Sequence, residues 1–211
     1  MIGVCRNCDA ALDFSWEEKL EVVNILASRF VSINNKQFLN KLLKHKNDIM
    51  IVVICSGMYN TPFENNTPSL RDVKSGIAYL ISNGFRTDRI VLGVHPVFYN
   101  TKGIIILENV LNYFKDSGVY KVRLLKLNLN EQIKRNFITK FNKIPKENQK
   151  LRYYGFYSII VCDDIKNFIN INKNDLLSFG VNDNSNFYRK ELLCEKKREC
   201  CYCCVYCHCH Y

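Results

Sequence analysis

The sequence lacks an apolar run long enough to span a membrane. Its longer hydrophobic stretches, such as residues 49–55 and 104–107, fall far short of the roughly 20 apolar residues that a transmembrane helix needs. The basic-then-apolar order of a secretory signal peptide is also missing from the first residues. We therefore expect an intracellular, cytoplasmic protein without a membrane segment.

Acidic residues are scarce relative to basic ones. Thirty Lys and Arg against 20 Asp and Glu give a formal net charge of +10 and a pI near 9.0. This balance is compatible with nucleic acid or another acidic partner, but the aromatic-plus-basic stripe of a nucleic-acid groove is missing, with residues 151–157 the nearest candidate. A chain of 211 residues that is 47% hydrophobic is expected to form one domain with a buried core.

Cysteine is unusually frequent and unevenly distributed. Seven of the 11 cysteines fall within the last 18 residues. The odd count, the missing signal peptide and the large apolar fraction favour reduced thiols that bind a metal or an iron-sulfur cluster over a disulfide framework. We therefore divide the chain into one α/β domain, residues 1–190, and a Cys-rich tail, residues 191–211.

The apolar pattern alternates between strand-length runs and stretches with helical spacing, which is typical of α/β proteins. The expected order is helix 15–27, strand 29–33, helix 36–44, strand 48–56, helix 69–83, strand 90–94, helix 104–115, strand 121–127, helix 131–141 and strand 157–162. Residues 167–186 read as a loop or short helix.

About five such units fit either an open doubly wound sheet or a partial (β/α) barrel, and periodicity alone does not choose between them. Both folds place their sites at the carboxyl ends of the strands. The polar or turn residues expected at these ends are Ser56, Gly57, Glu64, His95, Pro96, Lys126, Asn128, Asp163 and Asp164.

The tail carries three cysteines, Cys200, Cys204 and Cys207, at C-x3-C-x2-C spacing. Three thiolates on one tight loop can hold three irons of a [4Fe-4S] cluster and leave the fourth iron open. With Tyr206 before the third cysteine, the tail resembles the C-x3-C-x-aromatic-C motif of the radical S-adenosylmethionine superfamily. Most members carry this motif near the N-terminus, whereas here it lies close to the C-terminus.

Residues 52–98 also resemble the spore photoproduct lyase-like branch of that superfamily and an uncharacterised relative with a C-terminal cysteine motif. The shared features are a strand ending in Ser56-Gly57, a Glu-x3-Pro-Ser segment starting at Glu64, a turn at Gly84, and a strand ending in His95-Pro96-Val97. The resemblance covers roughly residues 29–145 plus the tail, and it implies a partial barrel of about five to six parallel strand-helix units.

The resemblance further implies the chemistry and its site. A reduced cluster would cleave S-adenosylmethionine to methionine and a 5′-deoxyadenosyl radical, which abstracts hydrogen from a substrate. Ser56, Gly57 and Glu64 would lie near the amino-acid part of this cofactor, and Lys126 and Asn128 would face its ribose or the substrate. The lyase-like branch makes nucleic acid a candidate substrate.

Other interpretations of the cysteines stay open. Zinc would fit Cys200, Cys203, Cys207 and His210, because Cys and His are both zinc ligands, and the protein would then be a non-enzymatic binding module. A low-complexity end or a degenerate family member without a cluster are further alternatives. Cys5-x2-Cys8 fits half a zinc site, a redox pair or ordinary thiols, and for Cys55 and Cys162 we expect core packing.

Overall fold

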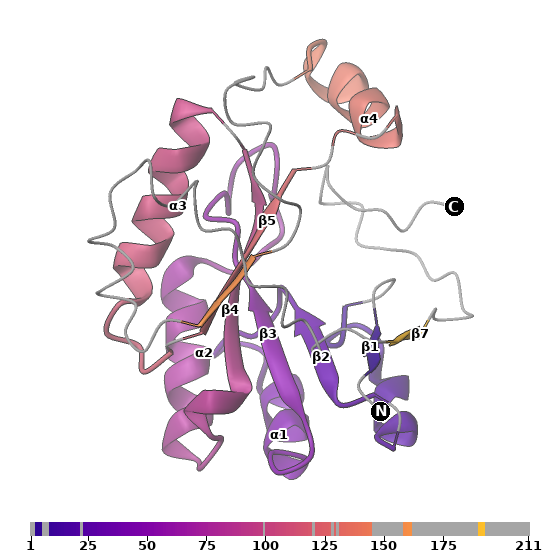
Figure 1. Cartoon of the computed structure of the whole chain (residues 1–211), viewed down its shortest axis with the longest axis vertical. Coiled ribbons are helices and arrows are strands. Elements are labelled where there is room, and N and C mark those ends of the chain that lie inside the picture. The colour runs from indigo at the N-terminus through magenta and orange to yellow at the C-terminus, as the bar shows by residue number, and fades with distance from the viewer. Residues whose placement is uncertain are drawn as a thin grey trace.

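The computed structural model describes residues 3–5, 9–21, 23–98, 100–119, 121–127, 129, 131–144, 158–161 and 190–192. In these residues one sheet has the strand order β6-β5-β4-β3-β2-β1-β7 (Figure 1). Its strands are β1 (Gly3–Cys5), β2 (Ile25–Ser28), β3 (Met50–Ile54), β4 (Ile90–Val97), β5 (Lys121–Lys126), β6 (Ser158–Val161) and β7 (Lys190–Leu192). The helices are η1 (Phe14–Lys19), α1 (Lys36–Lys44), α2 (Leu70–Ser82), η2 (Thr87–Arg89), α3 (Thr101–Phe114) and α4 (Glu131–Phe141).

Strands β2, β3, β4 and β5 are mutually parallel and follow one another in chain order across the sheet. Helices α1, α2 and α3 connect them, so each connection steps one strand further in the same direction. Because such crossovers are right-handed, all three helices must cover the same face. This confirms the expected α/β class, and the sequential order of the four parallel strands is consistent with a partial β/α fold.

The main core lies between the sheet and this single helical layer (Figure 1). Alternate strand residues point into it, because successive side chains of a strand face opposite sides. The helices contribute the residues that recur at three- and four-residue spacing, and the three connecting helices together supply Phe38, Leu39, Leu42, Val73, Ile77, Leu80, Leu107, Val110, Leu111 and Phe114. Burial of each large side chain contributes about 1.5–3 kcal/mol.

The opposite face of the sheet carries a smaller apolar cluster around Ile25, Val52 and Val91. Helix α4 lies outside the helical layer, beyond the carboxyl end of β5 (Figure 1). Its buried Ile133 and Phe137 pack with Met58 and Leu127 in a separate cluster. The carboxyl edge of the sheet is therefore bordered by α4 and by the β3–α2 loop. No helix within the described residues is long and apolar enough to cross a bilayer.

The expected helix 15–27 and strand 29–33 are wrong. Asp13 accepts a hydrogen bond from the Ser15 backbone and starts the short η1 instead. Strand β2 follows and pairs in parallel with β3 through registers that include Ile25 with Met50. The apolar residues of this segment fit a helical period, but pairing with a buried strand outweighed that local pattern. The short strand β1 had no counterpart in the sequence prediction.

Two later strands also differ from expectation. Strand β4 continues through His95 and Pro96, whose peptide bond is cis, and a register shift between Val94 and Val97 accommodates the proline. Strand β6 matches the expected position but is antiparallel to β5, and Val161 pairs with Lys121. It therefore ends at the amino edge of the sheet. The expected parallel direction of this strand is wrong, and the residues that follow it, Asp163 and Asp164, lie outside the described ones.

Candidate functional site

A buried pair of polar side chains marks the carboxyl end of β3. The Ser56 hydroxyl accepts a hydrogen bond from the Met58 backbone at 3.0 Å and donates one to the Glu64 carboxylate. Backbone bonds within the loop, from Thr61 to Met58 (3.2 Å) and from Glu64 to Thr61 (3.0 Å), fold the chain back on itself. As a result Ser56 is 5% exposed and Glu64 is 3% exposed.

Gly57 makes this turn sterically possible. Its φ of 78° lies in the left-handed region that residues with a side chain rarely adopt. A Cβ at this position would lie 2.6 Å from Val110 Cγ2 and 2.8 Å from Ile106 Cγ2 of α3. The Ser56-Gly57 sequence therefore lets the end of β3 turn tightly against α3 and directs the loop toward Glu64.

Glu64 sits in an environment that disfavours its negative charge. Burial raises the pKa of its carboxyl group, while the hydrogen bond from Ser56 and the positive charge of Arg29 act in the opposite direction. A cationic ligand group near this carboxylate would stabilise its charged form further.

A hollow lies over this pair and is partly open to solvent. Its cavity volume is about 10 Å³, close to the space of a single water molecule. Arg29 and Glu64 both line it, and the other lining residues include Cys55, Ser56, Gly57, Tyr59, Thr67, Pro68 and Leu70. A carboxylate and a guanidinium in one hollow offer complementary partners for a ligand that carries both charges.

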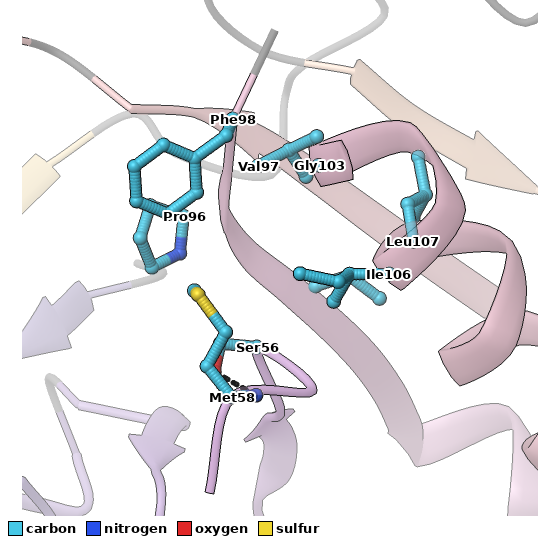
Figure 2. A pocket seen from close by; sticks show the side chains of 9 residues that line it. Ser56, Met58, Pro96, Val97, Phe98, Gly103, Ile106 and Leu107 are labelled. Atoms are coloured by element: carbon cyan, nitrogen blue, oxygen red, sulfur yellow. Dashed lines mark hydrogen bonds between the residues drawn. The ribbon is translucent and has the colours of Figure 1, made fainter. Parts of the chain in front are cut away.

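Ser56 also borders a second, mainly apolar hollow, with a cavity volume of about 10 Å³, between the end of β4 and the start of α3. Figure 2 shows the Met58 side chain directed toward Pro96 and Phe98, with Ile106 and Leu107 contributed by α3. Met58 is only 4% exposed. It thus fills much of the space between the β3–α2 loop and β4, and the polar hollow beside Glu64 is the better ligand site.

A second group of polar side chains crosses the sheet face opposite the helices. Burial lowers the pKa of His95 well below its usual range, and the charges of Arg29 and Arg123 lower it further. Arg123 is 9% exposed and Arg29 and His95 are half-buried. The structure therefore brings the expected strand-end residue His95 together with two arginines on β5 and just after β2.

Several predicted site residues are placed by the structure and others lie outside it. Ser56, Gly57 and Glu64 are brought together, and Lys126 pairs through its backbone with Val97 at the same edge. Asn128 and the tail cysteines Cys200, Cys204 and Cys207, together with the zinc alternatives Cys203 and His210, fall outside the described residues.

The described residues contain no group of three or more His, Cys, Asp or Glu side chains that could hold a metal ion. Cys55 is buried, and burial raises the pKa of its thiol to about 12, which agrees with the expected core position. Cys8 and Cys162 lie outside the described part of the chain, so the predictions for them stay predictions.

The sequence prediction missed Arg29, Arg123 and Asp9 as members of this site. Asp9 accepts hydrogen bonds from the backbone of Arg29 at 2.7 Å and of Ala11 at 3.0 Å. Burial raises its pKa, and the Arg29 charge opposes that rise. Arg123 could have been found from the strand pattern. It directly follows Val122, which is buried in the core, and successive strand residues face opposite sides of the sheet, so its charge lies on the face away from the helices.

Comparison with known proteins places the chain in no family. No family model matches the sequence, and neither the curated proteins nor the solved structures contain a significant match.

Proposed function

We propose that this protein is a radical S-adenosylmethionine-type enzyme whose cofactor binds at the carboxyl edge of the sheet, beside Ser56 and Glu64. The observation that carries the proposal is the buried Ser56–Glu64 pair in a hollow that also contains Arg29. The sequential parallel strands β2–β5, with all three connecting helices on one face, support a partial barrel of the kind this chemistry uses.

The charges of the hollow match those of a methionyl group. Glu64 would accept the ammonium group, and Arg29 would bind the carboxylate through its planar fork of donors. Gly57 keeps the backbone at the end of β3 close to α3, where a side chain would collide with Val110 and Ile106. In this arrangement Ser56 is a positioning residue, because its hydroxyl holds the Glu64 carboxylate.

The cluster would be held by Cys200, Cys204 and Cys207. When bound and reduced, a [4Fe-4S] cluster with an open iron supplies the electron that cleaves S-adenosylmethionine to methionine and a 5′-deoxyadenosyl radical. Strand β7 supports this assignment, because it is parallel to β1 and therefore ends at the carboxyl edge, and the first tail cysteine, Cys194, comes two residues after it. Lys126 and Asn128 remain the proposed contacts to ribose or substrate.

The substrate is proposed to be anionic, with nucleic acid as one candidate. The formal charge of +10 favours acidic ligands over neutral ones. Arg29 adds a cationic group in the proposed cofactor hollow, and Arg123 adds another on the same face of the sheet, near His95. This choice concerns the substrate class only and leaves the site of hydrogen abstraction open.

A second candidate function is a zinc-binding module that uses the α/β body as a scaffold. The observation that favours it is the pairing of Cys5 in β1 with Leu192 in β7. Cys8 follows Cys5 and the cysteine tail follows Leu192 in the chain, so the sequence continues toward these cysteines from two neighbouring strand ends. Four such ligands would close a tetrahedral zinc site without an open position.

Paired cysteine substitutions distinguish the two functions. In the radical enzyme, Cys204→Ala abolishes iron loading during anaerobic reconstitution, whereas Cys201→Ala leaves it intact. Metal content per chain is the readout. Equal loss in both variants contradicts the assigned C-x3-C-x2-C motif, and one zinc per chain that depends on Cys5 or Cys8 supports the binding module.

The cofactor hollow is tested separately. Glu64→Gln removes the carboxylate but keeps the size of the side chain, so we expect weaker binding of S-adenosylmethionine measured by calorimetry. Glu21→Gln is the matched control, because Glu21 is exposed. Unchanged affinity in the Glu64 variant would exclude this carboxylate as the ammonium partner.

A further inference from the structure

One row of the sheet carries an arginine at each end. Ile54 of β3 is in register with Gly93 of β4, and Gly93 is in register with Arg123 of β5. Ser28 pairs with Val53, so the next residue, Arg29, continues the same row beside Ile54. Neighbouring strands lie about 4.8 Å apart, so the backbones of Arg29 and Arg123 are separated by roughly 14 Å. Two long side chains can bridge most of that distance from opposite sides.

His95 lies between the two arginines. It is two residues beyond Gly93 in β4 and therefore faces the same side of the sheet. A Cβ on Gly93 would lie 3.5 Å from His95 Cδ2 and 2.9 Å from Val52 Cγ1. Because Gly93 has no side chain, it leaves space on the sheet for the His95 ring. The positive charges of both arginines act on this ring.

We propose that Arg29, His95 and Arg123 form an anion-binding site for the phosphate group of a ligand. Guanidinium groups bind phosphate through paired hydrogen bonds. A phosphate monoester has three terminal oxygens and nearly two negative charges, so arginines that approach from opposite sides can both engage it. A carboxylate presents only two oxygens and suits one such fork. The neutral imidazole supplies a further N–H donor.

Charged neighbours lie near both arginines. The Arg29 charge acts on the carboxyl groups of Asp9 and Glu64. Lys121 lies two residues before Arg123 on β5, and its ammonium group donates a hydrogen bond to the backbone carbonyl of Asp88. We expect both arginines to contribute to phosphate affinity, and Arg29 also to link the phosphate site to the hollow beside Glu64.

This inference goes beyond the proposed function and does not require a cluster. It concerns a second ligand group, on the sheet face away from the helices, whatever chemistry the tail supports. If the radical-enzyme proposal fails, the phosphate site still stands or falls on its own test.

The test follows the His95 ring by NMR in the full-length reduced protein, with inorganic phosphate as the probe. The chain has four histidines, and a His95→Gln variant assigns the signal. A bound anion favours the protonated imidazole, so phosphate raises the pKa of His95 in the wild-type protein. In Arg123→Gln this response to phosphate is lost. Arg86→Gln is the control, because Arg86 is exposed and precedes η2 at the amino edge.

Other outcomes separate the sources of an anion. Methionine, whose carboxylate is proposed to bind Arg29 alone, should raise the pKa of His95 less than phosphate does, and this smaller response should persist in Arg123→Gln. An equal response to methionine and phosphate would assign the site to the cofactor carboxylate and overturn the proposal. The same response to phosphate in wild type and Arg123→Gln, or no response in wild type, would also overturn it.

A folding defect is distinguished by a conservative variant. Arg123→Lys keeps the positive charge but lacks the fork of donors, so it should bind phosphate more weakly than wild type and more tightly than Arg123→Gln. Circular dichroism of each variant establishes that it is folded. Loss of phosphate binding in a folded Arg123→Gln protein, with graded retention in Arg123→Lys, is the result that the proposal requires.

Discussion

The Ser56 hydroxyl donates a hydrogen bond to the Glu64 carboxylate across the loop that follows β3, and both side chains are almost fully buried. This contact joins the end of a central strand to the loop that leads into α2. It also places a carboxylate beside Arg29 in a hollow at the carboxyl edge of the sheet. The stability of the fold and the binding capacity of the site therefore depend on the same pair.

The buried Glu64 should give stability a specific dependence on pH. The pKa of Glu64 is raised in the folded protein, chiefly by burial. The protonated side chain therefore contributes fully to the free energy of unfolding below the ordinary pKa of glutamate, and this contribution is lost as the pH rises through the raised pKa of the folded protein. Glu64→Gln cannot ionise. We measure the free energy of unfolding of both proteins by urea denaturation. We expect the value for Glu64→Gln to increase relative to that of wild type as the pH rises.

When the two proteins are compared at the same pH, the contributions of the other titrating groups to the free energy of unfolding cancel. His95 acts in the opposite sense, because its lowered pKa costs stability as pH falls, and that effect is common to both proteins. Glu21→Gln serves as the surface control. A difference between wild type and Glu64→Gln that stays constant with pH would show that burial does not perturb Glu64.

The turn at Gly57 should be intolerant of a side chain. Gly57→Ala must place a Cβ 2.6 Å from Val110 and 2.8 Å from Ile106. Gly118 has the same φ of 78°, but its nearest neighbour would be 3.3 Å away. Gly118→Ala therefore measures mainly the backbone cost, with a milder contact to Ile81. We expect Gly57→Ala to lower the free energy of unfolding by about 1–3 kcal/mol more than Gly118→Ala. Equal losses would mean that α3 moves aside freely.

Cys55 should be chemically silent in the folded protein. Its thiol is buried, and a pKa of about 12 leaves almost no thiolate at neutral pH. Brief alkylation followed by peptide mass spectrometry should leave Cys55 unmodified under native conditions and modify it fully in urea. Rapid native labelling would indicate that the end of β3 opens, which would contradict the packing around Ser56.

Helix α4 should be held to the edge of the sheet by its aromatic residues. Phe137 is 2% exposed, and its ring centroid lies 5.9 Å from that of Phe63 and 6.2 Å from that of Phe98. Phe137→Ala removes about 3–5 kcal/mol of packing. We expect faster hydrogen exchange in α4, while β3 and β4 keep their protection.

Ile138→Ala provides the control for α4, because Ile138 is on the same helix but 49% exposed. Its exchange pattern should match that of wild type. Uniform acceleration through the whole sheet in Phe137→Ala would show instead that α4 is part of the main cooperative core.

The sequence predicts the helical layer and the central strands well. Residues such as Ile77 and Leu80 recur at helical spacing on α2, and the Ser69 side chain caps that helix as expected, accepting a hydrogen bond from Asp72. Strand β3 reads as a continuous apolar run because both of its faces are covered. These patterns are local, so they survive in the folded structure.

The remaining features depend on contacts between distant parts of the chain. Residues 15–27 carry a helical signal that pairing between β2 and β3 outweighs. The direction of β6 is set by its antiparallel pairing with β5, which periodicity does not encode. Ser56 and Glu64 were expected at one edge, but the convergence of Arg29 and Arg123 on His95 follows from the register of four strands.

Anaerobic reconstitution with iron and sulfide tests the central claim most directly. The reconstituted chain is analysed by absorption spectroscopy and metal counting, before and after S-adenosylmethionine is added. The account predicts about four irons per chain, a thiolate-to-iron absorption band, and a spectrum that changes with S-adenosylmethionine in wild type but not in Glu64→Gln. A colourless protein that holds one zinc per chain would contradict it.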